Sequence, residues 1–250
     1  MTFDKISTLL HGIPYTSLSK GKNFYNIIIK NKFQNILELG FAHGVASCYM
    51  AAALDEIGSG KITVVDLEKS KNEKPNIEYL LNITKLSRYI DIFREKNSYN
   101  WFLNKEIEIN TDDNNNCIPK YDFVLIDGPK NWTIDGFAFF LVDKLLKTNG
   151  WICFDDYLWS YKNFLSSNMK VPNLNLNELS EDQINKPNIQ EVFHKLVMQH
   201  QSYSNFRVED NILAFAQKVK SQLKNLHYSS SASFKYKIID LIKKIFNRKY

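Results

Sequence analysis

Three aspartates follow two apolar runs of this sequence and could together bind a metal ion. Asp127 directly follows the run of residues 121–126, and Asp155 and Asp156 directly follow the run of residues 151–154. Carboxylates are hard oxygen ligands, and with water or substrate oxygens they can complete the octahedral shell that Mg²⁺ prefers. Three uncompensated carboxylates would otherwise repel one another. We therefore expect Asp127, Asp155 and Asp156 to be metal ligands.

A glycine turn earlier in the chain could hold a second ligand. Three residues separate Gly40 from Gly44, with an apolar run before them and a small-residue helical pattern after them. This order is typical of a strand, a ligand-binding loop and a helix. The G-x-G-x-x-G spacing of dinucleotide sites is absent, which disfavours a nicotinamide or flavin site. The next apolar run ends in Asp66, and an acid there can bind both hydroxyls of a ribose.

The elements that position these residues alternate along the chain. Short apolar runs alternate with helical patterns as far as Asp156, and residues 206–216 fit a closing hairpin. Such alternation predicts an α/β, Rossmann-like fold with a mainly parallel sheet, a final antiparallel hairpin and helices on both faces. Ligands bind beyond the carboxyl ends of parallel strands. Asp66, Asp127, Asp155 and Asp156 should therefore share one rim.

We expect one domain with two appendages. The predicted parts are an N-terminal helical cap over 1–33, a main domain over 34–218, and a linker with a C-terminal helix over 219–250. Within the main domain we predict helices over 76–86, 137–146 and 189–200, a polar surface loop over 106–119, and a loop or lid over 162–187.

The run Leu37-Glu38-Leu39-Gly40 with Gly44, followed by Asp66, resembles the cofactor site of class I S-adenosylmethionine-dependent methyltransferases. The resemblance extends in element order over roughly residues 12 to 218, and it implies a seven-stranded sheet and S-adenosyl-L-methionine as cofactor. Ala46 and Lys96-Asn97 depart from the residues usual in the family. The implied cofactor contacts are Glu38, Gly40, Phe41, His43, Gly44, Asp66, Leu67, Asn97, Ser98 and Asp127.

The acids at 127, 155 and 156 resemble those of metal-dependent O-methyltransferases, of the catechol O-methyltransferase type and the related sugar and antibiotic group. Lys130 matches the lysine that acts as base in the catechol enzymes. The resemblance implies that Lys130 and Asp127 are catalytic, that Mg²⁺ stabilises the alkoxide of the acceptor, and that Lys130 takes its proton. Nearby cations should then depress the pKa of Lys130. In the alternative interpretation, Lys130 forms a salt bridge with Asp127 or Asp135.

These features favour an enzyme, an S-adenosylmethionine-dependent O-methyltransferase that acts on a small hydroxylated acceptor. The run Asp155 to Trp159 and the long polar lid favour a sugar or glycan over a catechol, by resemblance alone. Trp132 could line the substrate or belong to the core, and Tyr15, Ser17 and Lys20 could contact ligands or simply be polar loop residues. The alternatives are a nucleic-acid or other N-methyltransferase and a non-catalytic binding module.

Composition limits the partners of the protein. Residues 234–250 hold six of the 32 Lys and Arg residues and one of the 27 Asp and Glu residues, which leaves 26 of each elsewhere. The chain outside residues 234–250 is therefore neutral, which argues against a nucleic-acid partner. No signal peptide and no run of about 20 apolar residues is present, so we expect a cytoplasmic protein. Three cysteines without paired spacing predict no zinc site and no disulfide framework.

The basic tail is the remaining feature of the sequence. On a helical wheel, residues 234–250 form a basic amphipathic helix. Such a helix can bind the inner face of the membrane peripherally, or it can pack on the body or on a second subunit in a homodimer. The sequence leaves these alternatives open.

Overall fold

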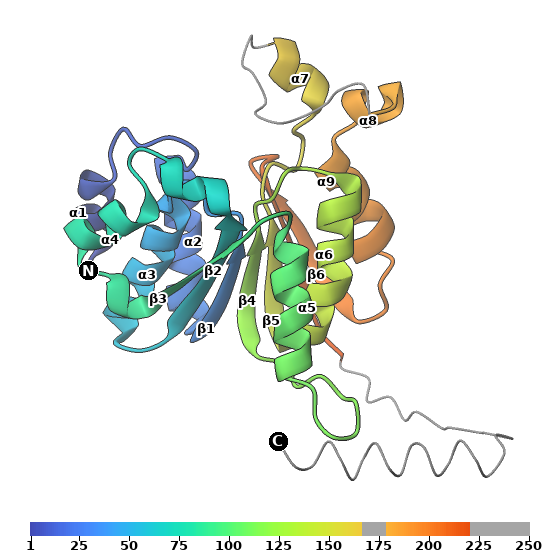
Figure 1. Ribbon diagram of the computed structural model, residues 1–250, viewed down its shortest axis with the longest axis horizontal. Coiled ribbons are helices and arrows are strands. Elements are labelled where there is room, and N and C mark those ends of the chain that lie inside the picture. Colours follow the sequence, from blue (N-terminus) through green and yellow to red (C-terminus); the bar gives the residue numbers. More distant parts are fainter. Residues whose placement is uncertain (167–178, 221–250) are drawn as a thin grey trace, which may run out of the picture.

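The computed structural model describes residues 1–166 and 179–220 (Figure 1). The predicted C-terminal helix and the middle of the predicted lid lie outside these residues. None of the described helices is both long and apolar enough to cross a membrane.

A single seven-stranded sheet forms the centre of the protein, in the order β3-β2-β1-β4-β5-β7-β6. The first five strands are parallel, and β7 pairs antiparallel with both β5 and β6. The predicted fold class and the closing hairpin are thereby confirmed. The strands are β1 (Asn35–Leu39), β2 (Lys61–Leu67), β3 (Ile90–Glu95), β4 (Tyr121–Ile126), β5 (Leu146–Phe154), β6 (Tyr203–Glu209) and β7 (Leu213–Lys218).

Helices cover both faces of this sheet, as Figure 1 shows. Helices α1 to α4 lie on one face, and α5, α6 and α9 lie on the other. The described helices are α1 (Phe3–Leu9), α2 (Leu18–Asn31), α3 (Val45–Ile57), α4 (Ile77–Thr84), α5 (Tyr99–Ile109), α6 (Trp132–Leu145), α7 (Tyr161–Ser166), α8 (Glu181–Asn185) and α9 (Asn188–Val192), with a π-helical turn over Phe193–Val197 and 3₁₀ turns over Glu68–Asn72 and Ser87–Tyr89.

Alternation along the central strands produces a separate core on each face. Successive side chains of a strand point to opposite faces, so Ile36 packs in the core under α1 to α4 and Leu37 packs in the core under α5 and α6. In the same way Phe123 and Val124 of β4 enter opposite cores. Both faces of the central strands are covered, which explains why these strands are continuous apolar runs in the sequence.

Some predicted boundaries were wrong. Helix α6 begins at Trp132 rather than Phe137, because the Asn131 side chain accepts hydrogen bonds from the backbone N–H groups of Thr133 (2.8 Å) and Ile134 (3.1 Å) and caps the helix. Helix α5 occupies the start of the predicted 106–119 loop. Strand β5 begins at Leu146 rather than Trp151, and its register with β4 shifts between Tyr121 and Phe123.

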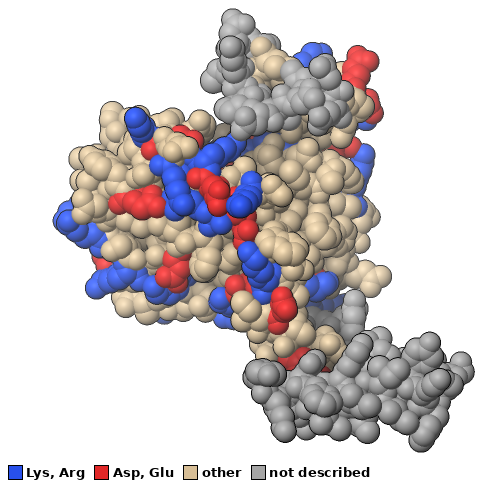
Figure 2. Space-filling view, viewed as in Figure 1, with Lys and Arg blue, Asp and Glu red and all other residues tan. Residues whose placement is uncertain are grey.

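Charges of both signs are interspersed over the face of the protein shown in Figure 2. Ion pairs among the described residues include Arg94 with Glu78 (2.8 Å) and Lys105 with Glu95 (2.8 Å). This face therefore has a mixed charge pattern.

Candidate functional site

The candidate site lies between β1 and β4, where the order of the strands in the sheet reverses. Strands β2 and β3 extend to one side of this pair and β5 to the other, which is where parallel α/β sheets bind ligands. Gly40 follows β1 with a φ of +91°, and a Cβ at this position would lie well under 3.0 Å from the carbonyl oxygen of Asp127. A residue without a side chain is therefore required where the turns after β1 and β4 meet.

One cavity of about 590 Å³ opens at this point and joins the two predicted subsites. Six of the predicted cofactor residues line it, and so do all three predicted metal ligands and Lys130. The prediction that four acids share one rim is confirmed. The lining residues are Tyr15, Gly40, Ala42, Asp66, Leu67, Lys69, Asn97, Ser98, Tyr99, Asp127, Gly128, Pro129, Lys130, Ile134, Asp155, Asp156, Trp159 and Phe164.

Four predicted cofactor residues lie behind this lining. Glu38 is fully buried on β1, and its Oε2 accepts a hydrogen bond from the Ser47 hydroxyl. Phe41 is buried, with the Arg94 guanidinium 5.4 Å from its ring centroid. The His43 ring stacks on the Tyr15 ring with the centroids 5.3 Å apart, and Gly44, with a φ of +89°, is the N-cap residue of α3. These residues shape the turn after β1 from behind the cavity wall.

Asp66 lines the cavity and also braces the glycine turn. Its Oδ2 accepts hydrogen bonds from the backbone N–H groups of Phe41 (2.9 Å) and Ala42 (2.7 Å), and its Oδ1 accepts one from Leu67 (2.6 Å). A carboxylate has about four acceptor positions, so these bonds leave about one position for a ligand hydroxyl. Asp66 therefore connects the shape of the turn to the adjoining part of the cavity.

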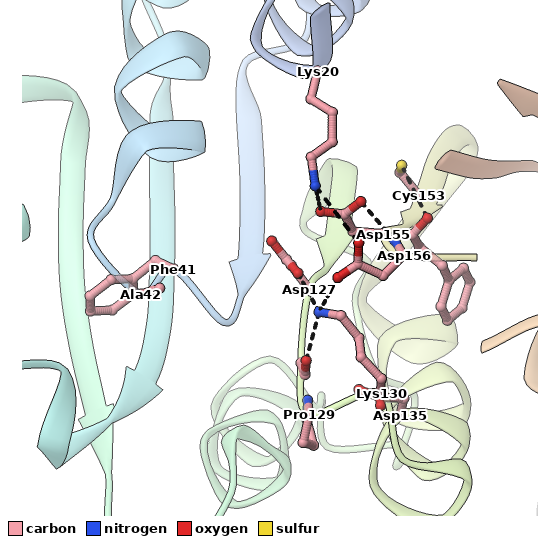
Figure 3. A network of polar contacts seen from close by, with 12 residues as sticks. Lys20, Phe41, Ala42, Asp127, Pro129, Lys130, Asp135, Cys153, Asp155 and Asp156 are labelled. Carbon is pink, nitrogen blue, oxygen red and sulfur yellow. Dashed lines mark hydrogen bonds and ion pairs between the residues drawn. The ribbon is translucent and has the colours of Figure 1, made fainter. Parts of the chain in front are cut away.

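The three other acids form a cluster with two lysines (Figure 3). Oxygen atoms of Asp127, Asp155 and Asp156 lie within 4.8 Å of one another. Lys130 contacts Asp127 at 2.5 Å and Asp156 at 3.4 Å. Lys20 reaches the cluster from α2, at 2.5 Å from Asp155 and 3.9 Å from Asp156. We call these five residues the acid–lysine cluster.

The charges of the acid–lysine cluster perturb its own ionisation. Burial raises the pKa of Asp127, and the neighbouring Asp155 and Asp156 raise it further. Burial alone would lower the pKa of Lys130, but Asp127, Asp156 and Asp155 together hold it above its ordinary value. The expected depression of the Lys130 pKa is therefore not found in the chain alone, because three carboxylates surround its ammonium. The salt bridge with Asp127, the alternative interpretation, is present.

The donor set of this cluster fits a divalent ion. Three carboxylates from two neighbouring strand ends offer hard oxygen atoms in one small volume, as Mg²⁺ requires. An isolated group of acids would not by itself identify a metal site. Here the acids line the same cavity as the glycine turn, so an ion bound to them would lie in the cavity that the turn also borders.

The N-terminal cap supplies residues that the sequence left undecided. Tyr15 lines the cavity, and Ser17 caps α2 by accepting a hydrogen bond from the Lys20 backbone N–H at 3.2 Å. Lys20 enters the acid–lysine cluster across 135 positions of the chain. Only the tertiary structure brings this lysine to the rim, because the sequence places it among ordinary polar residues.

An apolar wall borders the cavity beside the acid–lysine cluster. Trp159, Phe164 and Ile134 line it, and the Trp159 ring lies 4.8 Å from that of Tyr161 and 5.8 Å from that of Phe164. Sequence reasoning did not assign Ile134 or Phe164 to the site, because their apolar character equally suits a core. Trp132, which it left open, packs against the core beside α5 and α6.

Four residues that line the cavity have an unusual backbone conformation. Tyr15, Ala42, Lys130 and Asp156 have φ values of 77°, 45°, 59° and 58°, although residues with a side chain rarely adopt positive φ. All four line the cavity. Such conformations cluster at binding and catalytic sites, where the surrounding structure imposes them.

Comparison with known proteins agrees with this geometry. A family model described as "Methyltransferase domain" matches residues 37–157. No curated protein matches the chain at a significant level.

Three solved structures illustrate the similarity of fold. The O-methyltransferase TomG from Streptomyces achromogenes, involved in tomaymycin synthesis and solved with SAM, is 14% identical with a TM-score of 0.57, over 87% of this chain and 89% of that one. An O-methyltransferase from Bacillus cereus, solved with SAH, is 17% identical with a TM-score of 0.57, over 86% and 90%. The SAH-bound Podospora anserina methyltransferase PaMTH1 is 12% identical with a TM-score of 0.58, over 87% of each.

Proposed function

We propose that the protein transfers the methyl group of S-adenosylmethionine to a hydroxyl oxygen of a small acceptor, with Mg²⁺ bound at the acid–lysine cluster. The proposal starts from the match of residues 37–157 to the methyltransferase-domain model. The predicted resemblance to class I S-adenosylmethionine-dependent methyltransferases is confirmed. The observation that carries the proposal is the single cavity, which joins the glycine turn and Asp66 to the acid–lysine cluster.

The glycine-turn end of the cavity suits the methyl donor. Gly40 lets backbone approach a ligand closely, and Asp66 retains an acceptor position for a ribose hydroxyl. Beneath the turn, Glu38 Oε1 is buried and has no hydrogen-bond partner among the described residues. A buried polar atom of this kind is costly unless a ligand or water satisfies it. Asn97 and Ser98 add polar groups at the same end.

The acid–lysine cluster suits the proton chemistry of the acceptor. When bound, S-adenosylmethionine supplies the methyl group from its sulfonium, and Mg²⁺ supplies charge stabilisation for the acceptor oxygen. Asp127, Asp155 and Asp156 would hold the ion. Lys130 is an ammonium paired with Asp127 and Asp156, and an ion on these carboxylates would weaken both pairs and lower the pKa of Lys130. Lys130 would then release its proton to solvent and, as a neutral amine, take the proton of the acceptor hydroxyl. The acceptor oxygen then forms its bond to the methyl carbon as the carbon–sulfur bond breaks.

The apolar wall suits an acceptor that is only partly polar. Trp159, Phe164 and Ile134 offer apolar surface next to carboxylates and ammonium groups. A sugar or glycan presents hydroxyls on its edge and C–H groups on its faces, which matches such a mixed site. A saccharide acceptor is therefore our proposal for the substrate class, with a catechol as the competing hydroxylated acceptor.

The sequence and the site disfavour two other functions. A nucleic-acid or other N-methyltransferase is disfavoured because the sequence has no Asn/Asp-Pro-Pro-Tyr motif near Asp127, where Asp127-Gly128-Pro129-Lys130 stands instead. A non-catalytic binding module is disfavoured by Lys130, which a module that only binds cofactor would not need at this position.

Methyl transfer can be tested directly. Purified protein would be incubated with S-adenosylmethionine carrying a labelled methyl group, Mg²⁺ and separate panels of saccharides, catechols and amines, and products would be identified by mass spectrometry. We expect labelled O-methyl ether and S-adenosylhomocysteine, and loss of both in excess EDTA. Binding of S-adenosylmethionine would be measured by calorimetry alongside.

Each result bears on a separate part of the proposal. Absence of S-adenosylmethionine binding would refute the donor assignment, and full activity in EDTA would refute the metal. Labelled amine products alone would replace O-methylation with N-methylation. The proposed membrane or subunit contact of residues 219–250 is independent of these results and rests on the sequence alone.

A further inference from the structure

Lys20 is the one member of the acid–lysine cluster that lies outside residues 37–157, the span that matches the methyltransferase-domain model. It belongs to the first turn of α2, and its Nζ lies 2.5 Å from Asp155 Oδ2 and 3.9 Å from Asp156 Oδ1 (Figure 3). Its side chain is 12% exposed and that of Asp155 is 2% exposed. The ammonium therefore contacts a buried carboxylate that would bind the metal.

Packing of α2 holds Lys20 in this place. Gly21, the next residue, lies against the ring of Tyr49 on α3, and a Cβ at Gly21 would come within 2.8 Å of Tyr49 Cγ. The Gly21 backbone N–H donates to the Ser17 carbonyl at 2.9 Å, and the Ser17 hydroxyl caps the helix. Since the first turn is fixed on both sides, the long side chain of Lys20 is directed from a rigid base into the cluster.

The position of Lys20 conflicts with that of a bound divalent ion. Mg²⁺ binds oxygen ligands at about 2.0–2.1 Å. Both oxygens of Asp155 already have a partner, since Oδ2 accepts from the Lys20 ammonium at 2.5 Å and Oδ1 accepts from the Asp156 backbone N–H at 2.7 Å. Two cations on one carboxylate repel each other strongly in a partly buried site. Lys130 occupies the other side of the cluster, on Asp127 and Asp156. All three carboxylates are thus paired with ammonium groups in the structure.

We propose that Lys20 is a tethered cation that holds the acid–lysine cluster together without metal, and that a divalent ion binds Asp155 and Asp156 by displacing it. Lys20 is a positioning residue in this scheme, because it acts through the carboxylates. Metal binding is thereby coupled to the N-terminal cap, since the displaced side chain leaves the contact between α2 and the residues that follow β5. This inference rests on the proposed metal site.

Binding of Mn²⁺, followed by the electron paramagnetic resonance signal of the free ion, tests the competition. We expect Lys20→Met to bind Mn²⁺ about tenfold or more tightly than the wild type, a change equivalent to about 1.4 kcal/mol. Lys20→Arg keeps the charge and should bind as weakly as the wild type. Lys69 lines the same cavity but forms no ion pair with a described residue, so Lys69→Met is the matched control and should leave Mn²⁺ affinity nearly unchanged.

Displacement can also be measured in the wild-type protein, which avoids any effect of substitution on folding. Amine-reactive labelling of Lys20, quantified by mass spectrometry, should speed up when Mn²⁺ is added, whereas labelling of Lys69 should not. Unchanged labelling of Lys20 at saturating Mn²⁺, or equal Mn²⁺ affinity of wild type and Lys20→Met, would overturn the inference. Calorimetry with S-adenosylmethionine separates this failure from that of the proposed function, because donor binding would persist in one case and be absent in the other.

Discussion

Replacement of Gly40 by alanine tests whether the turns after β1 and β4 are built against each other. The added Cβ would lie well under 3.0 Å from the Asp127 carbonyl oxygen and 2.8 Å from the Asp127 carbonyl carbon. Both atoms belong to backbone, which cannot turn away as a side chain can. The Asp127 backbone must therefore shift, and with it the carboxylate that holds Lys130.

Two costs combine in Gly40→Ala. The φ of +91° is strained for any residue with a side chain, at about 1–3 kcal/mol. Overpacking against the Asp127 backbone adds about 1–3 kcal/mol. Gly58, at the end of α3, separates these terms because its φ of +86° is similar but nothing lies within 4 Å of its added Cβ. Gly58→Ala should therefore lose only the strain component.

Urea denaturation of the two variants measures this difference. We expect the free energy of unfolding of Gly40→Ala to fall below that of Gly58→Ala by about 1–3 kcal/mol. Calorimetry should also show weakened S-adenosylmethionine binding for Gly40→Ala and unchanged binding for Gly58→Ala. If both variants lose equal stability and both bind the donor normally, the close approach of the two turns has no energetic importance and the reasoning is wrong.

The remaining predictions concern three other residues. Asp66→Ala should weaken S-adenosylmethionine binding about tenfold or more, or roughly 1.5–3 kcal/mol by calorimetry, because it removes a ribose acceptor and the brace of the turn; unaltered affinity would contradict this. Lys130→Ala should lower the methyl-transfer rate by about 10²–10⁴-fold with donor binding retained, and unimpaired turnover would exclude its role in proton transfer. Asp122 accepts hydrogen bonds from the backbone N–H groups of Gln34 (2.9 Å) and Asn35 (2.8 Å) and from Lys147 (2.8 Å), so Asp122→Ala should destabilise the protein by about 1.5–3 kcal/mol at pH 7. Burial opposes ionisation of Asp122, but these partners hold its pKa below the ordinary value. The folded state therefore favours the charged form. The stability difference between wild type and Asp122→Ala should be complete above about pH 5 and should shrink as the pH falls below about 4. A difference that stays constant down to pH 3 in urea denaturation would refute the assignment.

The sequence by itself determined the fold and the rim of the site. Because consecutive apolar runs alternate with helical patterns, only a mainly parallel sheet buries them all, and Ile36, Leu37 and their neighbours divide between its two cores as the alternation requires. The carboxyl ends of parallel strands lie at one edge of the sheet, so acids that directly follow these strands come close together there. Asp127, Asp155 and Asp156 accordingly lie within 4.8 Å of one another.

Helix and strand ends were harder to place from the sequence. The start of α6 depends on the side chain of Asn131, which reaches two free backbone amides only after the chain has turned at Lys130. The start of β5 depends on pairing with β4, a contact between residues that are distant in the chain. Local propensity does not contain these interactions.

Only the tertiary structure decided which residues share the cavity and what charge they carry. Four residues of the glycine-turn motif lie behind the cavity wall: Glu38, Phe41, His43 and Gly44. Successive side chains of β1 point to opposite faces of the sheet, and the turn after β1 folds back onto the Asp66 carboxylate. Lys130 has a raised rather than a lowered pKa because three carboxylates surround it. Lys20 enters the cluster because α2 packs on α3 beside the strand ends. These facts depend on contacts between segments far apart in the chain, which side-chain types and spacing alone do not specify.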